Sequence, residues 1–295
     1  MKKIFRFENS EGFGIDIVNS AVTVVDKSKK YLLNNIEFST PVKINSTETT
    51  YRDGEYYKDN NLEACSIDIT VIVMGDNVED FKKLKSSLEK AFNPKLDEGL
   101  LIDKINNKCI KCICENVSFP KYDNECNAIY SISLKACYPY WNDLTESKLD
   151  IALWRGAFHF PLRCTTKNKI IMGVKEPSLI ANINNTGDVE VGLIVEFRAN
   201  GTVKNPSLFN INTREFIKIN ETMTAGETIR VNTNKGKKSA TRIDGEKEIK
   251  IMNLLDLDST FLQLKRGDNL FRYDAEEGFN FMDVTIYYNP SYLEV

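Results

Sequence analysis

Residues 64–94 read ACSIDITVIVMGDNVEDFKKLKSSLEKAFNP, and the spacing of their apolar residues changes once within the stretch. From Cys65 to Val73 every second residue is apolar, which is the period of a strand with one buried face. After Asn77 the apolar residues instead recur every three or four positions, which is the period of a helix. The stretch therefore predicts a strand followed by a helix packed on the same sheet.

The predicted helix has sequence signals at both ends. Asn77 is suited to cap the N-terminus, with Asp80 three residues further on, and Asn93-Pro94 ends the helix. Its apolar stripe consists of Phe81, Leu84, Leu88 and Ala91, with Phe92 beside it. No other part of the sequence predicts a helix as clearly.

The flanking sequence predicts further strands. Upstream, residues 46–61 (STETTYRDGEYYKDNN) are polar and aromatic, with Asp53-Gly54 as a turn signal, so we expect a projecting hairpin or loop. Downstream, alternating runs occur at 100–105, 108–119 and 127–138. Together these patterns predict an α+β domain over residues 1–141, in which one helix packs on a sheet.

The second half of the chain is entirely β in character. Residues 142–160 form a polar, mixed stretch, which we expect to be a linker. Residues 161–295 then contain short alternating runs about every ten residues, separated by Gly, Asn and Asp. This spacing predicts an antiparallel β-sandwich, so the fold class expected for the whole chain is mainly β.

Composition excludes some functions. The 295 residues are 42% hydrophobic and 27% charged, which is enough apolar material for two cores. The net charge of −3 argues against specific nucleic-acid binding, which usually requires a basic surface. Neither a secretory signal nor a membrane-spanning run is present, so we expect assembly in the cytoplasm and no membrane insertion.

The seven cysteines include one cluster that could suggest a zinc site. Cys109, Cys112 and Cys114 lack the second paired motif that a tetrahedral site normally requires. We interpret Cys112 and Cys114 as small apolar residues that alternate along a strand, and we predict no metal site.

The residues needed for catalysis are also lacking. The single histidine, His159, lies between aromatic residues and is interpreted as structural. Asp256 and Asp258 could share one face of a strand and hold a cation, but we favour solvated turn carboxylates. Because there is also no phosphate-binding loop, we predict no catalytic residue, no cofactor and no enzyme activity.

The order of these signals resembles the siphovirus distal tail protein family. In the N-terminal half the resemblance rests on residues 50–73, the helix, and the ending LKACYPYW with Cys137, Pro139 and Trp141. In the C-terminal half it rests on AFHFPL, NNTGDVEVGLIVEF, KNPSLFNINTREFIKIN, TAGETIRVNTNKGKKS, FLQLKRGDNLFRY and VTIYYNPSYLEV.

The resemblance implies a structural role at the tip of the virion tail, in the baseplate. Six N-terminal domains would form a homohexameric ring beneath the tail tube protein, with DNA passing through the channel. The C-terminal domain would be galectin-like and would contact the tail-associated fibre or lysin protein, and a receptor-binding protein where one is present, in host attachment. The expected subunit contacts involve the hairpin residues Tyr51, Arg52, Asp53, Tyr56 and Tyr57.

A second function stays open. A β-sandwich is a common scaffold for sugar binding, so the C-terminal domain could be a glycan-binding adhesion module. Such a module needs aromatic rings exposed on a concave face. The sequence resembles galectins only in its implied topology, because Asn205-Pro206 lies between Lys204 and Ser207 and not in the galectin sugar-binding motif.

Overall fold

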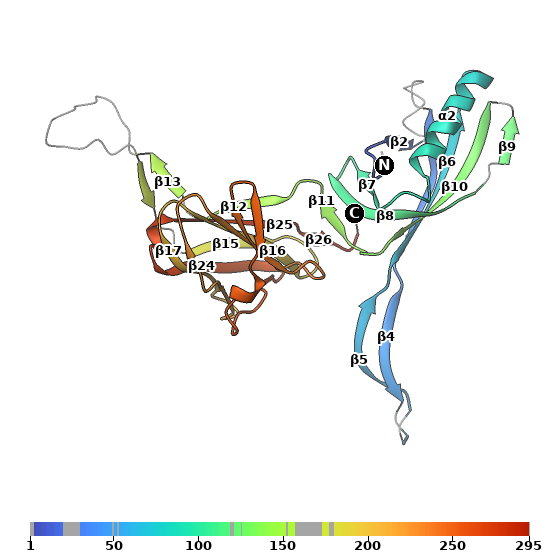
Figure 1. The fold of residues 1–295 in the computed structure, drawn as a ribbon. Helices are drawn as coiled ribbons and strands as arrows, with labels where there is room; N and C mark the ends of the chain where they lie inside the picture. The colour runs from blue at the N-terminus through green and yellow to red at the C-terminus, as the bar shows by residue number, and fades with distance from the viewer. Residues whose placement is uncertain are drawn as a thin grey trace, which may run out of the picture. The chain divides into compact units, whose positions relative to one another are not determined.

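The computed structural model describes residues 3–19, 30–48, 50–51, 53–118, 121–124, 126–151, 153–156, 173–176 and 180–294. The chain divides into two compact units, one of Met1–Leu144 with Tyr292–Val295 and one of Thr145–Ser291. Most of the described residues lie in strands (Figure 1). The expected fold class is confirmed: the described part of the chain is mainly β, with a helix on an N-terminal sheet and a C-terminal sandwich.

The first unit is built on a ten-stranded sheet that closes on itself. Seven strands follow one another in the order β8-β7-β1-β2-β3-β6-β10, and β10 also pairs with β8. This last pairing makes the sheet barrel-like. The pairing of β2 with β3 is parallel, and the other pairings around the ring are antiparallel. The strands of the sheet are β1 (Ile4–Glu8), β2 (Gly14–Asn19), β3 (Tyr31–Ser39), β6 (Cys65–Met74), β7 (Gly99–Asp103), β8 (Lys108–Val117), β9 (Lys121–Asn124), β10 (Asn127–Ala136), β11 (Trp141–Asp143) and β26 (Ser291–Tyr292).

Helix α2 (Val78–Ala91) lies against this sheet and contributes to its core, as predicted. The Asn77 side chain caps the helix by accepting a hydrogen bond from the Asp80 backbone N–H at 2.8 Å. Leu88 and Phe92 are fully buried, and the Phe92 ring stacks on Phe7 with centroids 4.3 Å apart. The alternating residues of β6 and β10 fill the same core, so the two-residue period predicted for both strands is confirmed.

Between β3 and β6 the chain extends into a separate two-stranded hairpin. Its strands are β4 (Val42–Glu48) and β5 (Glu55–Leu62), and we call residues 42–62 the arm. The arm projects from the barrel (Figure 1), as expected of a hairpin in this segment. Gly54, in the turn, has a φ of +91°, which glycine adopts more easily than other residues.

The second unit is a sandwich of two antiparallel sheets. One has the order β12-β25-β16-β20-β21-β22 with β23 also on β16, and the other has the order β15-β24-β17-β18 with β19 also on β17. Residues of both sheets share one core, including Phe197 from β16 and Phe271 from β24. The strands of the first sheet are β12 (Ser147–Asp150), β16 (Val191–Ala199), β20 (Thr228–Asn232), β21 (Ser239–Asp244), β22 (Lys247–Lys250), β23 (Gln263–Leu264) and β25 (Met282–Tyr288). Those of the second are β15 (Ile180–Asn185), β17 (Val203–Asn210), β18 (Phe216–Lys218), β19 (Thr222–Met223) and β24 (Gly267–Glu277).

Four further short elements belong to the second unit. The strands β13 (Leu153–Gly156) and β14 (Gly173–Glu176) pair with each other, and two 3₁₀ turns, η1 (Met252–Leu254) and η2 (Phe279–Phe281), connect strands of the sandwich.

The structure places strands where the sequence suggested a linker. Within residues 142–160, β11 belongs to the first sheet, whereas β12 pairs with β25 of the second unit. The chain also returns to the first unit after Ser291. There the Lys108 ammonium lies 3.0 Å from the centroid of the Tyr292 ring. The predicted boundaries, with a ring-forming domain over 1–141, a linker over 142–160 and a second domain over 161–295, stay predictions.

Candidate assembly surface

The arm presents two different faces. In an antiparallel pair, directly opposed residues lie on the same face of the sheet. The register pairs Val42 with Leu62, Ile44 with Asn60 and, after one irregularity, Ser46 with Tyr57 and Glu48 with Glu55. We call the face with Val42, Ile44, Tyr57 and Leu62 the apolar face. The opposite, polar face carries Lys43, Asn45, Thr47, Tyr56, Asp59 and Asn61.

The apolar face is open to solvent. Ile44 is 63% exposed, Tyr57 56% and Val42 50%. Single exposed apolar side chains are common on protein surfaces, but a contiguous group of them usually marks an interaction surface. An isolated two-stranded hairpin is also only marginally stable in water. Both considerations make this face a candidate interaction surface.

Acidic residues lie further out on the same face. Glu48 and Glu55 are directly opposed, and like charges in this position destabilise a sheet. The Ser46 hydroxyl donates a hydrogen bond to the Glu55 carboxylate, which keeps this carboxylate on the apolar face. The outer end of the face therefore suits a cationic group from a partner.

Four of the five residues expected at subunit contacts are described, and they lie on the outer part of the arm. Tyr51 is fully exposed in the turn, Asp53 is exposed beside it, and Arg52 lies outside the described residues. Tyr56 and Tyr57 are exposed but lie on opposite faces, so one flat partner surface cannot cover both. Whether these residues contact a second subunit stays a prediction.

Sequence reasoning missed the inner half of the apolar face. Val42 and Ile44 alternate with polar residues in PVKINS, which is the same pattern as in a half-buried strand. The pattern shows that a face is apolar. It does not show whether the same chain covers that face.

Two of the three clustered cysteines belong to the barrel core, and the third, Cys109, is only partly buried. Cys112 and Cys114 are buried on β8, which confirms their interpretation as small apolar strand residues. Desolvation by burial raises the pKa of the Cys112 thiol to about 12 and that of Cys114 to about 11. Among the residues that the structure describes, no group of three or more His, Cys, Asp or Glu is placed to hold a metal ion.

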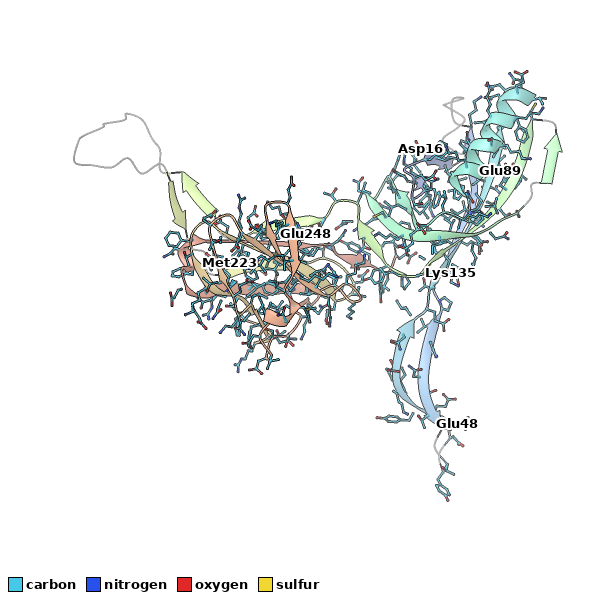
Figure 2. All side chains as sticks on the ribbon, in the orientation of Figure 1. Asp16, Glu48, Glu89, Lys135, Met223 and Glu248 are labelled. Atoms are coloured by element: carbon cyan, nitrogen blue, oxygen red, sulfur yellow. The ribbon has the colours of Figure 1, made fainter. Side chains whose placement is uncertain are left out.

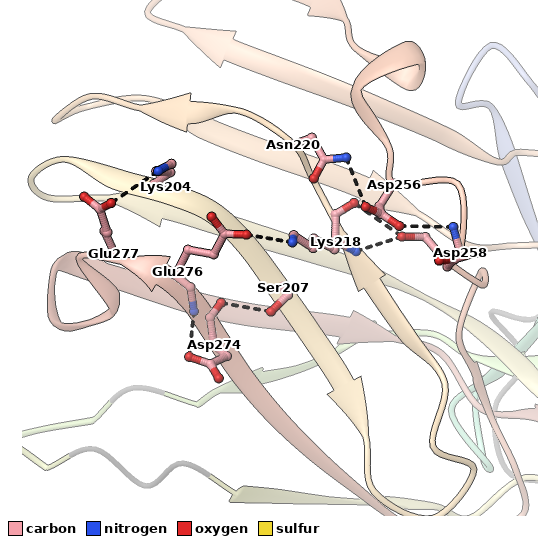
Figure 3. A network of polar contacts seen from close by, with 11 residues as sticks. Lys204, Ser207, Lys218, Asn220, Asp256, Asp258, Asp274, Glu276 and Glu277 are labelled. Carbon is pink, nitrogen blue, oxygen red and sulfur yellow. Dashed lines mark hydrogen bonds and ion pairs between the residues drawn. The ribbon is translucent and has the colours of Figure 1, made fainter.

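Asp256 and Asp258 lie in a turn, as favoured, and not on a strand (Figure 3). One Asp256 carboxylate oxygen accepts from the Asp258 backbone N–H at 3.1 Å, and the other accepts from the Asn220 side chain at 3.1 Å. The hydrogen bond from Asn220 lowers the pKa of Asp256. This carboxylate therefore stabilises a loop. His159 lies outside the described residues.

The outer face of the β15-β24-β17-β18 sheet carries charges that are paired with one another. Lys218 lies 2.8 Å from Glu276 and Lys204 lies 3.2 Å from Glu277 (Figure 3). The hydrogen bond between Lys218 and Glu276 raises the pKa of the lysine and lowers that of the glutamate. The Lys204–Glu277 pair joins the neighbouring strands β17 and β24, whereas the Lys218–Glu276 pair reaches from β18 across β17 to β24.

The same sheet does not favour sugar stacking. Phe209 and Phe216 are opposed on adjacent strands and are both partly buried. The guanidinium carbon of Arg272 lies 5.8 Å from the centroid of the Phe209 ring. A sugar would have to displace this cation before it could stack on the ring.

Comparisons with known proteins agree with both halves of the structure. Residues 19–135 match the family model described as a phage tail protein RIFT-related domain, and residues 186–292 match that of a siphovirus-type tail component, C-terminal domain. A search of curated proteins finds no significant match. No described helix is long and apolar enough to span a membrane.

Solved structures show the same fold over nearly the whole chain. The crystal structure of SPP1 Dit (gp 19.1), described as a paradigm of the hub adsorption apparatus in phages that infect Gram-positive bacteria, matches with a TM-score of 0.68 at 11% identity, over 98% of this chain and 99% of that one. A chain of the phage P2 baseplate in its activated conformation with Ca matches with a TM-score of 0.53 at 9% identity, over 97% and 98%.

These matches define the class of protein first: the chain is a structural tail component of a long-tailed phage, in which each unit corresponds to a tail-protein domain. More narrowly, the chain belongs to the siphovirus distal tail protein family. The resemblance noted in the sequence is thereby confirmed.

Proposed function

We propose that this protein is the baseplate hub of a long-tailed phage or tail-like particle and that six copies form a ring. The observation that supports the proposal most directly is the arm, which projects from a closed barrel and exposes an apolar face. In a cyclic ring every subunit offers one surface to its neighbour and a different surface to the other neighbour. The projecting arm would be one of these two surfaces.

Within the particle, the ring would join the tail tube protein to the tail-associated fibre or lysin protein and to receptor-binding components. The hub role is supported by the likeness to a protein described as a hub and to baseplate chains. In this proposal DNA passes through the ring without specific binding, which agrees with the net charge of −3. The second unit, with galectin-like topology, would point outward at the tail tip. Assembly would take place in the host cytoplasm.

The test is the mass of the purified protein by light scattering over a wide concentration range. We expect a species near six times the chain mass of 33.7 kDa, or a concentration-dependent rise towards it. The double variant Val42→Ser/Ile44→Ser should shift the equilibrium towards the monomer, because it removes the two aliphatic side chains that β4 contributes to the apolar face. Lys43→Ser, on the polar face of the same strand, is the matched control and should assemble like the wild type.

A wild-type protein that is monomeric at every concentration contradicts a self-assembling ring. If that monomer also binds a component of a glycan array, the result supports the alternative of a glycan-binding module. If the double variant assembles as well as Lys43→Ser, the arm is not part of the ring contact.

A further inference from the structure

Strand β22 (Lys247–Lys250, KEIK) forms one edge of the first sheet of the sandwich. In the part of the chain that the structure describes, β22 pairs only with β21, and all of its residues are exposed. An edge strand presents a row of backbone N–H and C=O groups to which another strand can pair. The free side of β22 is therefore available to a strand from outside the sandwich.

The hydrogen bonds to β21 show which backbone groups of β22 point to the free side. The Ile251 N–H, directly after the strand, donates to the Ala240 C=O at 2.9 Å. Hydrogen-bonded and non-hydrogen-bonded pairs alternate along an antiparallel ladder. Counting back from Ile251, the backbone groups of Ile249 are bonded to β21, whereas those of Glu248 and Lys250 point to the free side.

The side chains of Glu248 (labelled in Figure 2) and Lys250 lie on the same face of the sheet and carry opposite charges. Neither forms an ion pair with another described residue, and the residues opposite them on β21 are the uncharged Ile243 and Thr241. Ile249 lies on the other face and is 43% exposed. Three successive residues of β22 thus supply an acid, an exposed apolar side chain and a base.

This order is complementary to itself when two copies of the strand run antiparallel. If the Ile249 residues of both copies are directly opposed, each Glu248 faces the Lys250 of the second copy. The backbone groups of these two residues point to the free side, as a hydrogen-bonded pair requires. Opposite charges that are directly opposed stabilise a pair of strands. A shift of the register by two residues would instead oppose two lysines or two glutamates, so the charges select this register.

From this self-complementarity we infer that β22 is a docking edge for the β22 of a second copy of the chain. The first sheets of the two copies then join across a two-fold axis. Such a contact uses the same surface on both partners and is complete with two copies. It differs from the proposed ring contact, in which neighbours use different surfaces, and does not depend on it. Because β22 is short, the contact is small, and we expect the pairs at high protein concentration.

A disulfide between the two copies tests the register directly. Opposed residues of a non-hydrogen-bonded pair have Cα atoms about 4.5 Å apart, a separation that suits a disulfide. We would introduce Ile249→Cys together with Cys137→Ser, which removes an exposed native thiol, and add a mild oxidant at high protein concentration. The expected product is a covalent dimer, without longer chains, whose peptides contain a bond between the two positions 249.

The matched control is Lys247→Cys with Cys137→Ser, because Lys247 lies on the same strand and the same face as Ile249. In the inferred register the two positions 247 are separated by four residues along the strands, or about 13 Å. Cross-linking there should be slower by about tenfold or more. Equal rates at the two positions, or no covalent dimer from Ile249→Cys, would overturn the inference and leave the ring proposal untouched.

An exchange of the two charges provides a test without cysteine chemistry. Sedimentation equilibrium would be measured with Val42→Ser/Ile44→Ser as the parent, in which the proposed ring contact is weakened. Glu248→Lys and Lys250→Glu should each weaken pairing by about tenfold or more at low salt, because each opposes like charges. The two changes together should restore pairing, since they reverse the order of charges on both copies. If the combined variant pairs no better than the single ones, or if the parent does not pair at all, the inference is wrong.

Discussion

The two ends of one hairpin have the same strand pattern but different surroundings. At the barrel end, β3 pairs with β6, and alternate residues of β6 such as Ile67 and Val71 are completely buried beneath the helix and the other strands. At the far end the hairpin continues as β4 and β5, and Ile44 is 63% exposed. Alternation alone therefore creates an apolar face. Where other elements of the chain pack on that face, it stabilises the fold. Where they do not, it remains available for assembly.

The largest expected effect is a difference in thiol reactivity between cysteines inside the barrel and the cysteine on its surface. Burial raises the pKa of Cys112 to about 12, so near pH 8 its thiolate fraction is on the order of 10³-fold lower than that of an ordinary thiol. We expect an alkylating reagent to modify the exposed Cys137 rapidly and Cys112 and Cys114 only on unfolding. Mass spectrometry of time points would measure this. Fast labelling of Cys112 in the folded protein would contradict the buried barrel.

Removing a ring from the barrel core should have the next largest effect. Phe92→Ala deletes a fully buried side chain that stacks on Phe7, and such changes cost about 3–5 kcal/mol of unfolding free energy. Ile44→Ala on the arm should change it by less than about 0.5 kcal/mol, because the side chain is mostly in water in the monomer. Denaturant titration of dilute, monomeric protein measures both. Equal losses of unfolding free energy in Phe92→Ala and Ile44→Ala would contradict the distinction between a buried barrel and an exposed arm.

The smallest effect concerns the ion pairs that hold the barrel end of the hairpin to the helix. Lys30, just before β3, lies 2.6 Å from Asp80 in the first turn of α2, and this hydrogen bond lowers the pKa of Asp80 below its usual 3.8. A lowered folded-state pKa stabilises the fold above the unfolded pKa, and the contribution disappears as pH falls through the folded value. Asp80→Asn should therefore be slightly less stable than the wild type at pH 7.

Stability curves for the two proteins between pH 7 and pH 2 would check this expectation. The curves should converge below about pH 4, where the carboxylate of the wild type becomes protonated. A gap that stays constant down to pH 2 would show that Asp80 acts by packing or capping and not by its charge.

Local elements of the first unit could be predicted because their signals are local. A clear apolar period marks the strand from Cys65, the helix with its Asn77 cap and the strand up to Ala136. The turn at Asp53-Gly54 is marked by a glycine that adopts a positive φ. The closure of β8 on β10, the parallel pairing of β2 with β3 and the return of Tyr292 to the first unit were not predicted. These features depend on which distant strands meet, and many alternating strands offer equivalent partners.

The candidate site was predictable only in part for the same reason. A polar, tyrosine-rich turn predicted an exposed hairpin, and Tyr51, Tyr56 and Tyr57 are indeed exposed. The register between β4 and β5 shifts between Asn45 and Ser46, and this shift is needed to work out which face each tyrosine is on. No residue in the sequence predicts the shift. Val42 and Ile44 are exposed because of the fold. The sequence alone does not show which other segments pack over them.

The most direct test of the central claim, that the arm is an assembly element and not part of the monomer core, is backbone hydrogen exchange over residues 42–62. Exchange would be measured by mass spectrometry on dilute monomer and on the assembled species, with β6 as the internal reference. We predict fast exchange of the arm in the monomer, strong protection on assembly, and unchanged protection of β6. If arm exchange stays equally fast in the assembled species, the arm is not at the subunit contact and is not an assembly element.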